Sequence, residues 1–595
     1  MKHRTSIVLA HRPRLLKPGI LLLMLILILA GCNSPTNVVQ PTPSPTARLT
    51  FSSVSLGIPA DALNSPVVGP LADDTSMHVR LLFKVNQSQQ DQLNKISNQQ
   101  QDLTQLANQI GISDATFAQI KAQLGIQGVS LTLSKLHTSV AVDGKARSMA
   151  MLFQTHFVIH KYKGRTFYAP ATTPQLPAFI VNDLVSVTGL DSYSQPLQTG
   201  IPASQYKLNS AYTNASARAN CSAPAGEDFP GGVAHTYGYD QFARAGFLGQ
   251  GMTINLVEID GFPQSDVANY GQCVSYHGRI LIKNIDGAPA QPGEESALDI
   301  EQIEGLAPDA NIIDYQTGNH DIGTGIVDEL QQIVDDNAKN AGAGSIVSIS
   351  LEGAENLQSL NYLKGIDQLM SLLTQKEHMT VFVASGDCGA FMDRVYGSFS
   401  VSFPASDPTV VAVGGTMLQI NAQGKRASEV SWSDGSDTTQ CTNSWGSGGG
   451  NSNLFQQPSF QTGKGVQNDG SRGFREVSDV SAVALNLPLY FGGQWQTFPD
   501  GTGAGGGTSA ATPIWAAGMA LVNQSLIKKY HVFFVGPLVF YYVANHAGRL
   551  SPYFDVTQGT NLGFNATPGW DFATGLGTPN LVDFYNVLAA VASGH

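Results

Sequence analysis

Short apolar runs recur along the second half of the chain, and each predicts a buried β-strand. Segments with helical periodicity separate most of them, which is typical of a parallel sheet covered by helices on both faces. We therefore expect a doubly wound α/β domain with its functional groups at the carboxyl ends of the strands. The predicted strands lie within residues 249–261, 311–315, 345–350, 379–384 and 410–413.

The first half mixes strand and helix patterns without strict alternation, which indicates an α+β domain. Runs rich in β-branched and aromatic residues predict strands at 78–85, 129–136, 156–162 and 166–169. A Gln-rich helix is expected after the first of these strands. A second helix is expected at 114–124, with Ser113 or Asp114 as its N-cap.

The N-terminus has the pattern of a signal peptide. Basic residues precede an apolar run at 19–30, which is shorter than the roughly 20 residues of a membrane span. The run ends in Leu-Ala-Gly-Cys32, which resembles a bacterial lipobox, so we expect Cys32 to become the lipidated first residue of an exported chain. The alternative is an ordinary signal peptide with an incidental cysteine. Residues 33–48 are rich in Pro, Ser and Thr and predict an extended tether.

Length, charge and cysteine content narrow the possibilities. A chain of 595 residues exceeds a usual single core and indicates two or more domains. Its net charge of -12 argues against nucleic acid as a partner. After export, the other four cysteines can form disulfides. The pairs nearest in sequence are Cys221 with Cys273 and Cys388 with Cys441, although four cysteines allow three connectivities. The chain has no CxxC spacing, so we do not expect zinc.

A glycine run at 503–507 leads into Thr508, Ser509 and an apolar helix. Glycines allow a close approach of the backbone, and the first turn of a helix has free N–H groups that stabilise negative charge. Ser509 is therefore a candidate nucleophile. The alternative is a glycine loop before a buried helix. A phosphate-binding loop is disfavoured because no Gly-Lys-Ser/Thr follows the glycines.

Three carboxylates are further candidates. Glu295 and Asp299 are four residues apart, which places both on one helix face, where like charges can be relieved by sharing a proton. The alternative is a solvated acidic face. Asp387 lies in a Ser-Gly-Asp turn after a predicted buried strand, where it either projects into a cleft or caps a following helix.

Together these motifs resemble those of the sedolisin or kumamolisin-like serine-carboxyl peptidases. The resemblance rests on Glu-x-x-x-Asp before Ala307-Pro308, on Gly-Thr-Ser-Ala-Ala-Thr-Pro at 507–513 and on the turn at 385–387. It implies a subtilisin-like fold with a catalytic Ser-Glu-Asp triad and an oxyanion-hole acid. The residues in these roles would be Ser509, Glu295, Asp299 and Asp387, with Glu258 extending the carboxylate network. A buried carboxyl on a strand needs a partner, and we expect Glu295 to provide it for Glu258. The alternative for Glu258 is a strand-end residue that faces solvent.

The segments 161–170, 177–180 and 185–190 resemble the activation prodomain of the same family, which has a ferredoxin-like fold and blocks the cleft until it is removed. The resemblance implies a zymogen. The expected domains are a signal peptide at 1–31, a tether at 32–75, the prodomain at 76–192, a linker with the processing site at 193–222 and the catalytic domain at 223–595.

The resemblance also implies a Ca²⁺ site near the C-terminus. Its ligands would be the side chains of Asp555 and Asp571 and the main-chain oxygens of Val556, Thr567 and Gly569. Calcium prefers six to eight such oxygen ligands. Thr567 stands where the family often has glycine, which matters little if only its carbonyl binds. The alternative is a pair of Asx turns.

The carboxylate chemistry predicts activity in acid. A histidine base with a pKa near 6.5 is protonated around pH 4, whereas a glutamate can still accept a proton there. One segment departs from the family pattern, because Ser-Leu-Glu-Gly at 350–353 replaces the common Ser-Trp-Gly in a segment that lines the substrate cleft. This puts the subsite preferences in doubt, and we expect Glu352 to favour basic substrate residues once it is ionised.

The sequence therefore predicts a secreted, acid-acting endopeptidase, monomeric and attached to the membrane only through a lipid, whose substrates are proteins or peptides. One alternative is a tripeptidyl-type exopeptidase of the same family. Another is a catalytically silent, calcium-stabilised surface binding protein that has kept the scaffold.

Overall fold

The computed structural model describes residues 49–85, 100–195, 197–198, 221, 231–319, 321–393, 398–421, 423–433, 444–496 and 505–594. Several predictions fall outside these ranges. They are the signal peptide, the tether up to residue 48, the lipidation site Cys32, the Gln-rich helix and Cys441. Within the described ranges, no helix is both long and apolar enough to cross a bilayer.

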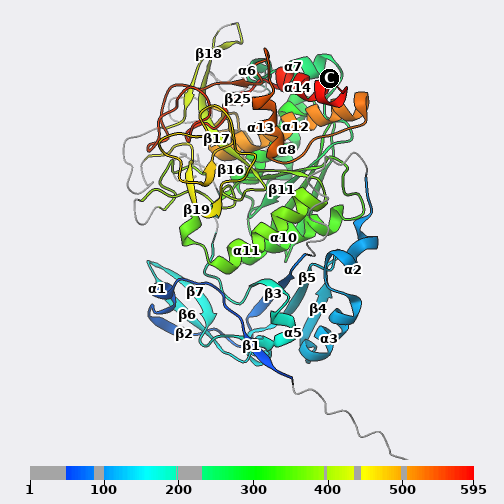
Figure 1. Cartoon of the computed structure of the whole chain (residues 1–595), viewed down its shortest axis with the longest axis vertical. Coiled ribbons are helices and arrows are strands. Elements are labelled where there is room, and N and C mark those ends of the chain that lie inside the picture. Colours follow the sequence, from blue (N-terminus) through cyan, green and yellow to red (C-terminus); the bar gives the residue numbers. More distant parts are fainter. Residues whose placement is uncertain are drawn as a thin grey trace, which may run out of the picture. The chain divides into compact units, whose positions relative to one another are not determined.

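The larger domain, coloured from green to red in Figure 1, is built on an eight-stranded sheet. Its strand order is β12-β13-β11-β14-β16-β17-β18, and β21 also pairs with β17. All pairs are parallel except β17 with β18. The strands are β11 (Thr253–Glu258), β12 (Ile280–Ile285), β13 (Asn311–Thr317), β14 (Ile346–Ile349), β16 (Thr380–Ala384), β17 (Val411–Ile420), β18 (Arg426–Ser431) and β21 (Val480–Val483). The predicted doubly wound parallel sheet is confirmed.

Helices bury both faces of this sheet. Leu256 and Ile312 pack in one apolar cluster with residues of α9 (Glu294–Leu306) and α12 (Thr508–Tyr530). Their neighbours Val257 and Tyr315 pack in another cluster, with α10 (Ile322–Asn337) and α11 (Leu360–Ser371). Burial of both faces explains why the predicted strands are continuous apolar runs. The other helices of this domain are α6 (Gly231–Tyr237), α7 (Tyr239–Arg244), α8 (Gln264–Val274), α13 (Leu538–Asn545) and α14 (Leu581–Ala592).

Short strands within the loops complete this domain. They are β15 (Leu351–Glu352), β19 (Gly450–Gln456), β20 (Phe474–Val477), β22 (Tyr490–Phe491), β23 (Gln494–Trp495), β24 (Tyr553–Phe554) and β25 (Thr578–Pro579). The strand β10 (Leu197–Gln198) comes from the preceding linker and pairs antiparallel with β15.

The first domain, blue and cyan in Figure 1, has a four-stranded antiparallel sheet in the order β4-β5-β3-β9. The chain passes from β3 through a helix to β4, turns into β5 and reaches β9 after further helices, which is the ferredoxin-like arrangement that the resemblance implies. Ser113 is the N-cap of α3, as predicted, and accepts a hydrogen bond from Thr116 N at 3.0 Å. These elements are β3 (Ser76–Phe83), α3 (Asp114–Leu124), β4 (Val129–Leu133), β5 (Ser139–Lys145), α4 (Ala146–Leu152), α5 (Ala178–Val181) and β9 (Leu184–Thr188).

The predicted tether is too long, because residues 51–75 are folded. Val54, Leu56 and Ile58 alternate along the chain and are buried in the core of the first domain. Their apolar side chains anchor a stretch whose glycine and prolines suggest a linker. The folded elements here are β1 (Phe51–Ser53), which pairs with β8 (Gln175–Pro177), α1 (Ala60–Leu63), and β2 (Val67–Pro70), which forms a three-stranded sheet with β6 (Phe157–Tyr162) and β7 (Arg165–Pro170).

One of the proposed disulfides is present. Cys221 is bonded to Cys273 at the end of α8, with a Cα–Cα distance of 5.2 Å. Cys388 is also in a disulfide. Its expected partner, Cys441, lies outside the described residues, so that pairing stays a prediction.

Candidate active site

Ser509 lies in the first turn of α12, directly after the glycine-rich loop. It is fully buried, with 0% of its surface exposed. The preceding Gly507 has a φ of +94°, and a Cβ at this position would approach Asp387 Oδ2 to 2.5 Å. Only glycine accepts both this backbone conformation and this contact. The glycine therefore allows the start of the helix to lie against the Asp387 carboxyl.

Glu295 and Asp299 lie together on α9, as their spacing predicts. They are 7% and 0% exposed, so the alternative of a solvated acidic face is wrong. Ser509 Oγ donates a hydrogen bond to the Glu295 carboxylate. Burial, followed by the charge of Asp299, raises the pKa of Glu295 well above its usual range, and the bond from Ser509 opposes this rise.

Glu258 is buried behind this pair at the end of β11, so the alternative that it faces solvent is wrong. Its hydrogen-bond partner is Asp299, not Glu295 as its expected role implied. A bond between two carboxyl groups requires that one of them carries a proton. Asp299 Oδ1 and both Glu258 oxygens have no other hydrogen-bond partner among the described residues. The two side chains therefore share one proton.

Ser350 connects the two helices of the site. Pro513 in α12 has no N–H, so the Ser509 carbonyl oxygen lacks its usual helical partner. Ser350 Oγ lies 3.3 Å from this oxygen and donates a hydrogen bond to Asp299 Oδ2 at 2.6 Å. No role for Ser350 was predicted from the sequence. Its position directly after β14 was the only signal that could have identified it.

Asp387 is held beside the same helix terminus. Its Oδ1 accepts hydrogen bonds from Thr508 N at 2.8 Å and from Thr508 Oγ1 at 2.7 Å. Its own N–H donates to Glu352 Oε2 at 2.8 Å. Asp387 thus accepts the free N–H of the first residue of α12, as a cap of a following helix would, and at the same time lies beside Ser509.

These side chains gather at the carboxyl ends of neighbouring parallel strands, as expected for this fold. Glu258 ends β11, Ser350 follows β14 and Asp387 lies three residues after β16. The arrangement presents a hydroxyl that is hydrogen-bonded to a carboxylate, a proton-sharing pair behind that carboxylate and a further carboxyl beside the hydroxyl. Such a group can activate an oxygen nucleophile without an imidazole.

Comparison with known proteins agrees with this geometry. Residues 64–193 match the activation domain of pro-kumamolisin, and residues 285–532 match the subtilase family. Kumamolisin from Bacillus sp. (strain MN-32) is 29% identical over 506 residues, which cover 81% of this chain and 85% of the relative. Sedolisin from Pseudomonas sp. (strain 101) is 27% identical over 551 residues, covering 88% and 86%. The chain belongs to the sedolisin-like serine-carboxyl peptidases.

This peptidase has an activation prodomain and is therefore made as a zymogen, with proteins or peptides as its substrates. A solved structure of Pseudomonas sedolisin, complexed with two molecules of pseudo-iodotyrostatin, aligns with a TM-score of 0.49 and 23% identity. The alignment covers 67% of this chain and all of that structure.

The prodomain of the peptidase contacts α10 and α11. Arg80 of β3 forms an ion pair with Asp328 of α10, and both side chains are largely buried. Asn361 of α11 bonds the backbone of β9 through both atoms of its amide, since Oδ1 accepts from Val187 N at 3.2 Å and Nδ2 donates to Val187 O. Gln368 Nε2 donates to Phe83 O at 2.8 Å. Backbone and charged contacts thus hold the prodomain in the zymogen.

The linker of the peptidase contributes one more strand. Leu197 and Gln198 pair antiparallel with Glu352 and Leu351, the segment that departs from the family pattern. An extended piece of the chain therefore lies along β15, close to Asp387. The polar composition of residues 191–222 predicted only a linker, because a two-residue strand leaves no periodic signal.

The candidate calcium loop of the peptidase is tightly hydrogen-bonded. Asp571 Oδ2 accepts from Thr567 N at 2.8 Å, and Asp555 Oδ2 accepts from Gly569 N at 2.9 Å. Asp571 Oδ1 also accepts from Ala573 N at 2.9 Å, which is an Asx turn. Burial raises the pKa of Asp571 to about 6, while these amide bonds oppose the rise. Both carboxylates therefore contact one short loop, where carboxylate and carbonyl oxygens are the available donors.

Proposed function

We propose that this zymogen is an acid-acting endopeptidase with Ser509 as nucleophile, Glu295 as general base and Asp299 as the residue that orients it. Asp387 is the proposed hydrogen-bond donor to the oxyanion, and Glu258 supports Asp299. The observation that carries the proposal is the hydrogen bond from Ser509 to Glu295, with the proton-sharing pair of Asp299 and Glu258 behind it.

In the proposed reaction, Glu295 takes the Ser509 proton as Oγ attacks the substrate carbonyl carbon. The carbonyl oxygen becomes negative and accepts a hydrogen bond from protonated Asp387. Glu295 then gives the proton to the leaving amine, and water hydrolyses the acyl-enzyme by the same steps in reverse order. A single oxyanion donor contributes about 10²- to 10³-fold to kcat.

The proposed acidic optimum follows from the charges that the reaction needs. Three carboxyls, Glu295, Asp299 and Glu258, share the site, and like charges oppose each further ionisation. The hydrogen bonds from Ser509 and Ser350 and the proton shared by Asp299 and Glu258 stabilise the negative charge of the cluster. Activity therefore needs an ionised Glu295, the shared proton on the Asp299–Glu258 pair and a proton on Asp387, and these conditions hold together only in acid.

The linker strand supports an endopeptidase over a tripeptidyl exopeptidase. Leu197 and Gln198 are internal to the chain, yet they pair with β15. An internal segment can therefore lie along this strand without presenting a free N-terminus. Tripeptidyl-peptidase 1 of Dictyostelium discoideum is 29% identical over 311 residues, which cover 49% of this chain. An N-acetylated protein substrate distinguishes endopeptidase from tripeptidyl-peptidase activity, because it has no free N-terminus. Internal cleavage of that substrate is expected.

We also propose a Ca²⁺ ion at the loop of residues 567–571, bound by Asp555, Asp571 and the main-chain oxygens of Val556, Thr567 and Gly569. The donors fit a hard cation, because two carboxylates contact the same loop. When bound, the ion supplies charge neutralisation and rigidity, not a reactive centre. The hydrogen bonds from the loop to Asp571 and Asp555 hold the loop with or without the ion.

Export through a signal peptide, lipidation of Cys32 and a monomeric state complete the proposal. The disulfide between Cys221 and Cys273 supports an oxidising compartment.

The deciding experiment is acidification of the purified precursor to about pH 4, the range in which carboxyl groups titrate. Wild type is expected to remove its own prodomain, and Ser509→Ala is expected to stay intact. Ser525→Ala, which removes a buried hydroxyl from the same helix, serves as the control and should process normally. If purified Ser509→Ala, with no other peptidase present, removes its prodomain at the wild-type rate, Ser509 is not the nucleophile.

A further inference from the structure

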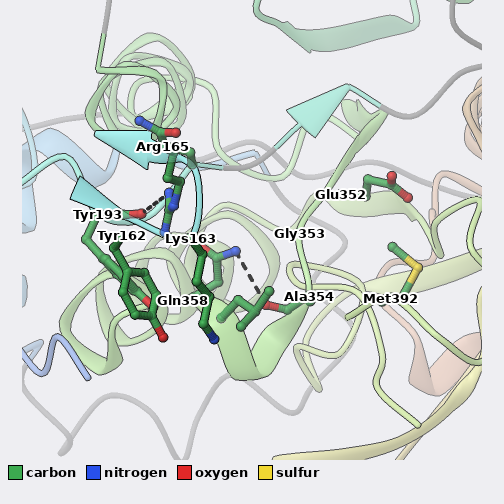
Figure 2. Close-up of a pocket in the computed structure, with 11 residues that line it drawn as sticks. Tyr162, Lys163, Arg165, Tyr193, Glu352, Gly353, Ala354, Gln358 and Met392 are labelled. Atoms are coloured by element: carbon green, nitrogen blue, oxygen red, sulfur yellow. Dashed lines mark hydrogen bonds between the residues drawn. The ribbon is translucent and has the colours of Figure 1, made fainter. Parts of the chain in front are cut away.

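A pocket of about 220 Å³ lies beside β15. In Figure 2, Glu352 and Met392 of the catalytic domain lie on one side of it. Tyr162, Lys163 and Arg165 of the prodomain lie on the opposite side. Two cationic side chains of the prodomain therefore line the same pocket as a buried carboxylate.

Glu352 is close to the proposed reaction centre. Its Oε2 accepts the Asp387 N–H at 2.8 Å, and Asp387 Oδ1 accepts the N–H of Thr508, which precedes Ser509. The backbone of Glu352 also pairs with the extended linker segment. A polypeptide that follows the path of the linker consequently places a residue near its scissile bond next to this carboxylate.

The catalytic-domain wall of the pocket suits a long cationic side chain. Gly353 and Ala354 leave space, while Leu357 and Met392 present apolar surface to a methylene stem. Glu352 is only 1% exposed, so its carboxylate acts in a medium that screens charge poorly. An arginine or lysine fits this combination of an apolar channel and a terminal negative charge.

The prodomain supplies matching charge in the precursor. Lys163 lies in the tight turn between β6 and β7, and Arg165 is the first residue of β7. Arg165 Nη1 is fixed by donating to Tyr193 O at 2.7 Å. Removal of the prodomain takes these cations away and leaves the wall that carries Glu352. The vacated volume then becomes available to a substrate side chain.

We propose that this pocket is the subsite through which the mature enzyme selects arginine or lysine near the scissile bond, with Glu352 as the selecting carboxylate. This inference rests on the proposed peptidase function. Glu352 lies in the segment that departs from the family pattern, so the proposed preference is a property of this chain's own residues.

The test uses the acid-matured enzyme and internally quenched peptides with blocked ends. At each of the three positions before the scissile bond, one peptide carries arginine and its partner carries citrulline, which has the same shape and no charge. Wild type is expected to show a kcat/KM ratio of arginine to citrulline of about tenfold or more at one position. In Glu352→Gln, whose amide oxygen still accepts the Asp387 N–H, this ratio is expected to fall to within about twofold of unity.

Two further variants keep the test decisive. Glu377→Gln neutralises another buried carboxylate that does not line the pocket, and it should retain the wild-type ratio. Ala354→Lys places a cation in the pocket without removing Glu352, and it should abolish the preference even if Glu352→Gln fails to fold. An arginine-to-citrulline ratio near unity in wild type, or a wild-type ratio in Glu352→Gln or Ala354→Lys, overturns the proposed subsite. In either case, cleavage of the citrulline peptides still shows that the enzyme is an active peptidase. Failure to cleave any peptide overturns the proposed function and the subsite with it.

Discussion

The Ser509 hydroxyl is hydrogen-bonded to the Glu295 carboxylate, and the two residues begin different helices that pack against each other. The groups that act on Glu295 within the described part of the chain are carboxyls and this hydroxyl, not an imidazole. The chemistry proposed for the site is therefore that of carboxylic acids, and its pH dependence is the property that distinguishes it from histidine-based hydrolysis.

Replacement of Glu295 by glutamine is expected to lower kcat by about 10²- to 10⁴-fold, because the amide still accepts the Ser509 hydrogen bond but cannot take its proton. Initial rates on a peptide substrate at the acidic optimum measure this loss. Glu294→Gln, an isosteric change at the neighbouring residue, is the control and should keep most of the activity. Equal losses in the two variants would point to damage to α9.

Asp387→Asn is expected to change the shape of the pH profile. The asparagine amide can donate a hydrogen bond at any pH, whereas an aspartic acid donor loses its proton as the pH rises. We expect the variant to lose activity at the acidic optimum by up to about 10³-fold, because the amide is a different donor in a site built for an acid. The remaining activity should decline less steeply between pH 5 and 8. A wild-type profile scaled down at all pH values would contradict this role.

The central strands of the sheet are predictable because both faces are buried, which produces uninterrupted apolar runs such as β14 and β16. β12 is absent from the prediction because it lies at the sheet edge, where Leu281 is exposed and Lys283 interrupts the run. In the prodomain, the start of the fold is missed since Val54, Leu56 and Ile58 stand in a stretch with glycine and prolines.

For the site, spacing along one helix predicts that Glu295 and Asp299 share a face. The bond between Asp299 and Glu258 and the contacts of Ser350 join elements that are distant in sequence, and no local pattern encodes such contacts. The resemblance to a family identifies the residue types of the site. Their partners follow only from the packing of α9 against α12 and the sheet.

Glu304→Gln is expected to flatten the dependence of stability on pH. Burial raises the pKa of Glu304 from an ordinary 4.5 to about 9. Below pH 4.5 the residue is protonated in both the folded and unfolded states, so the substitution should be nearly neutral there. As the pH rises towards 9 the unfolded chain ionises while the folded chain keeps its proton, so wild type loses stability. At pH 8 the glutamine variant should be more stable by about 2 to 4 kcal/mol.

Urea unfolding of the precursor at pH 4.5 and pH 8 measures this difference, with Ser509→Ala in both proteins to prevent self-cleavage. The same difference in unfolding free energy at the two pH values would show that the Glu304 carboxyl does not titrate in this range.

The ion pair between Arg80 and Asp328 is expected to make prodomain release sensitive to pH. Burial raises the pKa of Asp328 to about 7, although the charge of Arg80 opposes the rise. Acidification through this range protonates Asp328 and removes the partner of Arg80. Asp328→Asn should imitate the acid state, so its prodomain should be released at a higher pH than in wild type. Loss of one partner of a buried pair costs about 3 to 5 kcal/mol.

The pH of half-maximal processing, followed by gel electrophoresis, measures the effect of Asp328→Asn. Lys145→Ala is the control, because Lys145 Nζ donates to Ser76 within the prodomain at 2.9 Å. An unchanged midpoint in Asp328→Asn would show that this ion pair does not control release.

Removal of calcium is expected to lower the melting temperature of the peptidase. A ligand that binds only the folded state stabilises it by about 2.7 kcal/mol at one hundred times its Kd, so the melting temperature should rise with added Ca²⁺ and fall with a chelator. Asp555→Ala removes one proposed ligand from the exposed side of the loop. This variant should have a lower melting temperature than wild type, and neither Ca²⁺ nor the chelator should change it. Asp583→Ala, in the first turn of α14, is the matched control and should respond like wild type. If wild type itself is insensitive to the chelator, the loop of residues 567–571 is held by its Asx-type hydrogen bonds alone.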